Sequence, residues 1–104
     1  MELDVIQLKQ ELEQGVPLTV LDVREPYELE ISKLDMSLDI PMGQIPQRLD
    51  ELDRQANIAV LCRSGQRSAN VQAFLLENGF DKVRNITGGI LAWAEHNDPG
   101  MPKY

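Results

Sequence analysis

The chain of 104 residues is 42% hydrophobic and 26% charged, and its net charge is −7. This length fits a single domain over residues 1–104, and the hydrophobic fraction is too high for an intrinsically disordered chain. No apolar run approaches the roughly 20 residues of a membrane-spanning helix, and the negative charge disfavours binding to nucleic acid or to anionic membranes. The first residues contain no basic stretch that leads into an apolar one, so we expect a protein of the cytoplasm.

The first half of the chain alternates between helix-like and strand-like segments. Apolar residues recur at helical spacing over residues 5–12, and residues 18–21 form an apolar run typical of a buried strand. Pro26 suits the first turn of a short helix, and a short strand is predicted over residues 38–40. Apolar residues then return at helical spacing, which predicts an amphipathic helix over residues 45–52.

The second half repeats this alternation. Residues 58–61 and 83–86 are predicted to be strands, the helix that contains Val71 is predicted to end at Asn78-Gly79, and a last helix contains Trp93. Strands that are apolar without interruption are typically buried on both faces. The sequence therefore predicts an α/β fold with a mainly parallel central sheet and helices on both faces.

Cys62, the sole cysteine, follows the predicted strand at 58–61 directly. In an open parallel sheet, ligands bind beyond the carboxyl ends of the strands, which is where this thiol falls. One cysteine and one histidine cannot form a disulfide or a structural zinc site, so no metal and no cofactor is expected. Cys62 is either an inert residue of the core or a residue that takes part in a chemical reaction.

The loop after this strand has the composition of an anion-binding site. It contains two basic residues in an acidic chain, and a glycine that permits a tight turn into the next helix. Such a loop stabilises a thiolate and holds an anionic substrate beside it, whereas the plain alternative is a buried cysteine with two solvent-facing arginines. We expect Cys62 to be the catalytic nucleophile and the following loop residues to bind the substrate: Arg63, Ser64, Gly65, Gln66, Arg67 and Ser68.

Three motifs resemble those of the single-domain rhodanese-like sulfurtransferases. They are Leu21-Asp22-Val23-Arg24-Glu25 with Tyr27-Glu28, the loop from Cys62 to Ser68, and Gly88-Gly89-Ile90-Leu91-Ala92-Trp93. The resemblance covers nearly the whole chain and implies a three-layer fold with a mainly parallel sheet between helices. It also implies that Cys62 takes sulfur from thiosulfate or a persulfide donor and passes it to a thiol, cyanide or a protein acceptor.

Two other functions are considered beside this one. Phosphatases with a Cys-x5-Arg loop are related, but here Arg67 gives the shorter Cys-x4-Arg loop that the resemblance associates with sulfur. A catalytically silent regulatory or binding module of the same family is the second alternative. Whether the protein processes free thiosulfate or relays sulfur between proteins stays open, as does its oligomeric state.

The chain departs from the family pattern in one segment and leaves one pair of residues ambiguous. Lys33 stands where the family usually has a histidine, and Met36-Ser37 replaces Gly-Ala. We expect this change to alter a turn and the rim of the pocket. Asp22 and Arg24 either support the active loop, with Asp22 accepting loop amides or pairing with Arg67, or form an ordinary structural ion pair.

Overall fold

The computed structural model describes all 104 residues and contains one sheet of five strands. The strands are β1 (Glu2–Leu3), β2 (Thr19–Asp22), β3 (Leu38–Asp39), β4 (Asn57–Leu61) and β5 (Lys82–Ile86). Their order in the sheet is β1-β5-β4-β2-β3, and every neighbouring pair is parallel. β4 therefore occupies the centre, which is where a strand needs apolar residues on both faces.

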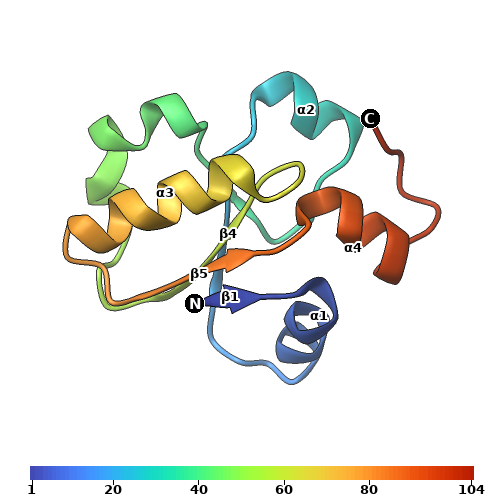
Figure 1. Cartoon of the computed structure of the whole chain (residues 1–104), viewed down its shortest axis with the longest axis horizontal. Coiled ribbons are helices and arrows are strands. Elements are labelled where there is room, and N and C mark those ends of the chain that lie inside the picture. The colour runs from blue at the N-terminus through green and yellow to red at the C-terminus, as the bar shows by residue number, and fades with distance from the viewer.

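Helices cover both faces of this sheet (Figure 1). The α-helices are α1 (Val5–Glu13), α2 (Pro26–Ile31), α3 (Gln66–Glu77) and α4 (Gly89–Asn97). One core cluster joins the sheet to α3 through Val71 and Leu75, and another joins it to α1 and α4 through Leu8 and Ile90. The expected α/β fold, with a parallel sheet between two helical layers, is confirmed.

The prediction of an α-helix over residues 45–52 is wrong. Two 3-10 segments, η1 (Met42–Gln44) and η2 (Pro46–Glu51), occupy this stretch, and Arg48 has non-helical backbone angles. The backbone leaves helical angles at Arg48, so the chain closes short turns here instead of a continuous α-helical ladder. Ile45 and Leu52 are nevertheless buried, because the short turns still direct these apolar side chains into the core.

Strand β1 is an element that sequence periodicity did not indicate. It has two residues, and it pairs with β5 at the edge of the sheet. Two residues are too few to show an apolar period, so only the tertiary pairing defines this strand. None of the helices is long and apolar enough to cross a membrane.

Candidate active site

Cys62 lies immediately beyond the carboxyl end of the central strand β4, and its side chain is buried. The chain turns at Gly65, whose φ of 112° lies in the left-handed region, and α3 begins at the next residue. Glycine adopts this conformation at little steric cost, which explains why the tight turn falls there. The expected position of the loop, between the central strand and a helix at the carboxyl edge of the sheet, is the one the structure has.

The sulfur of Cys62 receives hydrogen bonds from the loop around it. The backbone N–H of Gly65 donates to Sγ at 3.0 Å, and the Ser68 hydroxyl lies 3.3 Å from Sγ. Burial of the thiol raises its pKa, but hydrogen bonds from the Ser68 hydroxyl and from the amides of Ser68, Gly65 and Ser64 outweigh burial. The net result is a pKa of Cys62 below its ordinary value, which favours the thiolate.

The first turn of α4 holds the loop in place from the opposite side. The N–H groups of Ile90 and Leu91 donate to the carbonyl oxygens of Cys62 and Arg63, at 2.9 and 3.2 Å. A Cβ atom on Gly89 would lie within 2.5 Å of the main chain of these two loop residues. The second glycine of the Gly88-Gly89 motif thus permits a close approach that any side chain would block.

Arg67 forms an ion pair with a residue of α2. Its guanidinium donates two hydrogen bonds to the carboxylate of Glu28, at 2.7 and 2.8 Å. Glu28 is buried, and its pKa is lowered to about 2, chiefly by these bonds from Arg67. Of the alternatives left open for Asp22, the pairing with Arg67 is therefore not formed, because the Arg67 guanidinium binds Glu28.

Asp22 instead binds Arg24, and both side chains are fully buried. The two residues form three hydrogen bonds between their side chains, and the Arg24 N–H donates to the same carboxylate. Arg24 also donates to the hydroxyl of Tyr104, which in turn donates to Glu28 at 2.6 Å. The structural ion pair is thus linked, through Tyr104 and Glu28, to the arginine of the loop.

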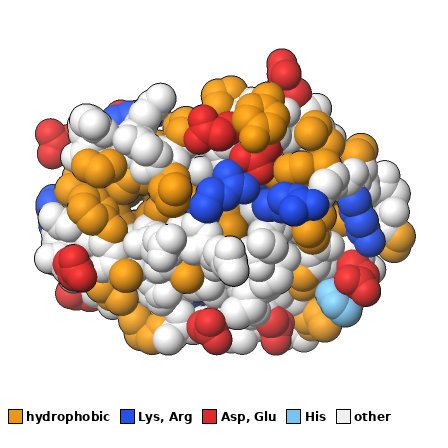
Figure 2. Space-filling model, turned by 45° about the horizontal axis from the view of Figure 1, so that its top comes forward, with side chains coloured by type: hydrophobic (Ala, Val, Ile, Leu, Met, Phe, Trp, Pro, Cys, Tyr) orange, Lys and Arg blue, Asp and Glu red, His pale blue; other side chains and the backbone are white.

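Arg63, the other basic residue of the loop, binds the end of the chain. Its Nε donates to the main-chain oxygen of Tyr104 at 2.7 Å, its NH2 group reaches the same oxygen, and the guanidinium lies 5.1 Å from the Tyr104 ring centre. Tyr104 thus holds Arg63 through both its main-chain oxygen and its ring, and Arg63 forms no ion pair with an Asp or Glu side chain. Figure 2, in which the top of Figure 1 comes toward the viewer, shows a row of basic side chains with acidic side chains beside it.

The other loop residues differ in their exposure to solvent. Ser64 and Gln66 are exposed, whereas Ser68 is buried and donates to Asn85 of β5. Sequence reasoning did not single out Asn85, Tyr104 or the role of Glu28. Asn85 could have been found as a polar residue in the strand predicted over residues 83–86. Glu28 was already part of the first of the three motifs. No local pattern marks Tyr104.

The segment that departs from the family pattern closes a turn around Asp39. Lys33 donates to Asp39 at 2.8 Å, and the Ser37 hydroxyl donates to the same carboxylate at 2.7 Å. Met36 is more than half exposed and lies beside this turn in the chain. The change that this segment makes to the turn and to the rim of the pocket stays a prediction.

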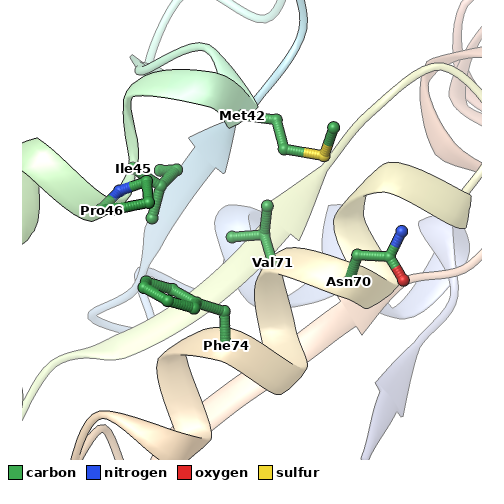
Figure 3. Close-up of a pocket in the computed structure, with 6 residues that line it drawn as sticks. All are labelled: Met42, Ile45, Pro46, Asn70, Val71 and Phe74. Atoms are coloured by element: carbon green, nitrogen blue, oxygen red, sulfur yellow. The ribbon is translucent and has the colours of Figure 1, made fainter.

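An apolar pocket of about 200 Å³ lies between α3 and the two 3-10 segments (Figure 3). Its lining combines residues of η1 and η2, and Ile45 between them, with residues of α3 that lie within two turns after the loop. The residues are Met42, Ile45, Pro46, Asn70, Val71 and Phe74. None of them belongs to the loop, so the pocket is a neighbour of the candidate site rather than part of it.

Comparisons with known proteins agree with the fold. The model of the rhodanese-like domain matches residues 4–96. A protein named sulfurtransferase from Allochromatium vinosum is 36% identical over 98 residues, which cover 94% of this chain and 92% of that protein. YtwF of Bacillus subtilis is 37% identical over 98 residues, covering 94% of each protein. The crystal structure of a rhodanese-like domain protein from Staphylococcus aureus covers 100% of this chain and 99% of its own, with a TM-score of 0.86 and 30% identity.

Proposed function

The chain belongs to the rhodanese-like sulfurtransferase family, and we propose that it transfers sulfur from a small anionic donor through a persulfide on Cys62. The observation that supports this most directly is the environment of the sulfur. A buried thiol receives a hydrogen bond from the Gly65 amide, and its pKa lies below the ordinary value. A thiolate prepared in this way is a nucleophile that needs no separate general base.

The proposed reaction has two steps. In the first, the Cys62 thiolate attacks the outer sulfur of thiosulfate, a bond forms between Sγ and that sulfur, and the former sulfur–sulfur bond breaks with its electron pair on the leaving sulfite. In the second step, a thiolate or cyanide attacks the outer sulfur of the persulfide, and Cys62 leaves as a thiolate. Each step moves one sulfur atom, and the second step returns Cys62 to its starting state.

The two loop arginines have different roles in this proposal. Arg63 pairs with no Asp or Glu side chain, and we propose that the donor displaces Tyr104 from it, so that the guanidinium binds the oxygens of the donor and of the leaving sulfite. Arg67 shares its charge with Glu28 and is proposed to hold the loop around the sulfur. The exposed side chains of Ser64 and Gln66 are proposed to add hydrogen bonds to the donor.

A second candidate is a regulatory or binding module without turnover. Two observations favour it: Cys62 is buried, and both loop arginines are already engaged by residues of the same chain. A donor has to reach the sulfur and displace Tyr104 from Arg63, whereas a binding module needs neither. The two candidates differ in whether Cys62 accepts sulfur.

The deciding experiment is the intact mass of the purified protein before and after incubation with thiosulfate. The proposal expects a gain of about 32 Da, one sulfur atom, in wild type and none in Cys62→Ser, because the sulfur is held covalently on the only cysteine. Sulfite release is measured in the same samples. A wild-type protein that gains no mass with thiosulfate or with a persulfide donor would overturn the proposed transfer and favour the binding module.

A further inference from the structure

Asn85 of β5 is buried beneath the loop, and its two amide atoms contact two different loop residues. The Nδ2 group donates to the carbonyl oxygen of Gly65 at 3.2 Å. Because a carbonyl oxygen only accepts, the nitrogen must face Gly65, and this fixes the orientation of the amide. The oxygen Oδ1 therefore faces Ser68, whose hydroxyl donates to it at 2.5 Å.

The Ser68 hydroxyl has one proton and two neighbours that compete for it. Asn85 Oδ1 has no proton of its own, so the Ser68 proton must point at Asn85 to make the 2.5 Å contact. With the proton in that position, the Ser68 oxygen accepts from the Cys62 S–H across 3.3 Å. The three side chains then form one chain of hydrogen bonds, S–H to O–H to amide oxygen.

Loss of the thiol proton breaks this arrangement. A thiolate only accepts, so the Ser68 hydroxyl stabilises it only by turning its proton from Asn85 to Sγ. Two oxygens without a proton between them then face each other, and Asn85 has to withdraw. Asn85 also holds the carbonyl of Gly65, and the N–H of this same residue donates to Sγ. Withdrawal of Asn85 therefore disturbs the loop that surrounds the sulfur.

We propose that Asn85 is a positioning residue that acts through Ser68 and favours the states in which Sγ carries no negative charge. One such state is the thiol. The other is the persulfide, whose charge lies on the outer sulfur, so this part rests on the proposed function. Asn85 would thereby oppose the free thiolate and stabilise the sulfur-loaded enzyme relative to it.

Other charges near the sulfur do not replace this effect. Arg67 of α3 is the charged side chain that interacts with the Cys62 thiolate, and Glu28 shares its charge. On the neighbouring strand β2 the charge of Asp22 is neutralised by Arg24. The α4 side contributes the N–H of Ile90, which binds the Cys62 carbonyl and not the sulfur. The hydroxyl of Ser68 is thus the one group in this set whose proton can point either to or away from Sγ.

The test is a double-mutant cycle with the pKa of Cys62 as its readout. Because Cys62 is the only cysteine, thiolate absorbance followed against pH reports on this residue alone. The variants are Asn85→Leu, Ser68→Ala and the double variant, each checked for folding by circular dichroism. Asn57→Leu makes the same substitution at the opposite end of the sheet, in β4, and serves as the control.

The proposal expects Asn85→Leu to lower the pKa of Cys62 by about 0.5–1, the equivalent of one freed hydrogen bond. In the Ser68→Ala background the same substitution is expected to leave the pKa unchanged, and Asn57→Leu is expected to have no effect. A pKa that stays the same or rises in Asn85→Leu would overturn the proposal, as would an equal fall in both backgrounds. If Asn85→Leu does not fold, Asn85→Ala carries the same expectation.

A second readout tests the persulfide. After loading with thiosulfate and removal of the donor, Asn85→Leu is expected to lose the added sulfur to a thiol acceptor several-fold faster than wild type, whereas Asn57→Leu behaves as wild type. Equal rates would overturn the stabilisation of the persulfide. The pKa cycle uses no sulfur donor, so it decides the role of Asn85 even if wild type gains no sulfur and the proposed transfer fails.

Discussion

Glu28 and Arg67, 39 residues apart in the chain, form a two-bond ion pair that ties α2 to the loop around Cys62. The carboxylate is almost completely buried, whereas the guanidinium is about one-third exposed. The Tyr104 hydroxyl binds the same carboxylate, so the end of the chain meets the loop at this point. The positive charge of Arg67, which could otherwise attract a donor anion, is therefore already balanced by Glu28.

Glu28→Gln is expected to lower the free energy of unfolding by about 1–3 kcal/mol. This loss is smaller than that expected for a fully buried pair, because Arg67 is partly exposed and its charge is screened by solvent. Urea unfolding at pH 7 measures the change. Glu51→Gln is the matched control, since its pair with Arg48 is exposed and its loss should lower the free energy of unfolding far less than Glu28→Gln does. Equal effects of the two substitutions would contradict the importance of the buried pair.

Acid is expected to remove the same stabilisation. The pKa of Glu28 is lowered from 4.5 to about 2 in the folded protein, chiefly by Arg67, so folding favours the ionised carboxylate. This stabilisation is fully present above about pH 4.5 and is lost as the pH falls toward 2. Urea midpoints from pH 7 to 2.5 should fall more steeply in wild type than in Glu28→Gln. The remaining slope includes Glu11, whose pKa is lowered by Arg84. Parallel curves for the two proteins would contradict the prediction.

Arg63→Gln is expected to reduce kcat/KM for thiosulfate about 10-fold to 100-fold, mainly through KM, because one charged hydrogen-bond donor is lost. Initial rates of sulfite release against thiosulfate concentration give both constants. Arg54→Gln is a close control: Arg54 also donates to a main-chain oxygen, that of Asn78, and its guanidinium also stacks on an aromatic ring, that of Phe80. If both substitutions leave KM unchanged, Arg63 does not bind the donor.

Gly89→Ala is expected to destabilise the fold by about 2 kcal/mol or more and to disturb the loop. Its new Cβ would lie 2.4–2.5 Å from the main chain of Cys62 and Arg63, and its φ of 59° adds strain. Thermal unfolding and the rate of Cys62 alkylation measure the two effects. Gly43→Ala has nothing within 4 Å of the new Cβ and should change stability little. A Gly89→Ala protein as stable as Gly43→Ala would be incompatible with the close packing of α4 on the loop.

Asp22→Asn is expected to cost about 3–5 kcal/mol, because it leaves the buried guanidinium of Arg24 without a counter-charge. Asp39→Asn removes the carboxylate that binds exposed Lys33 and should cost about 1 kcal/mol or less. Chemical unfolding of both variants provides the comparison. A small loss in Asp22→Asn would show that Arg24 finds another partner in the fold.

The sequence by itself determined most of the architecture. Continuous apolar runs such as 58–61 can only be buried on both faces, which requires a parallel sheet between helices. The helix expected over 45–52 is not formed, because the backbone leaves helical angles at Arg48 and apolar spacing does not distinguish short 3-10 turns from a continuous α-helix. The loop from Cys62 to Ser68 was predicted from composition, since a thiol, two arginines and a glycine lie within seven consecutive residues.

Tertiary structure alone decided which residues surround this loop. Glu28, Asn85 and Tyr104 come from α2, β5 and the end of the chain, and each is distant from Cys62 in sequence. Whether Arg67 pairs with Asp22 or Glu28 depends on the path of α2 over the carboxyl edge of the sheet, which no local pattern contains. The composition of the loop specifies the chemistry that is available, whereas the charge and the proton that reach Cys62 depend on contacts between distant segments, and these are fixed only when the chain folds.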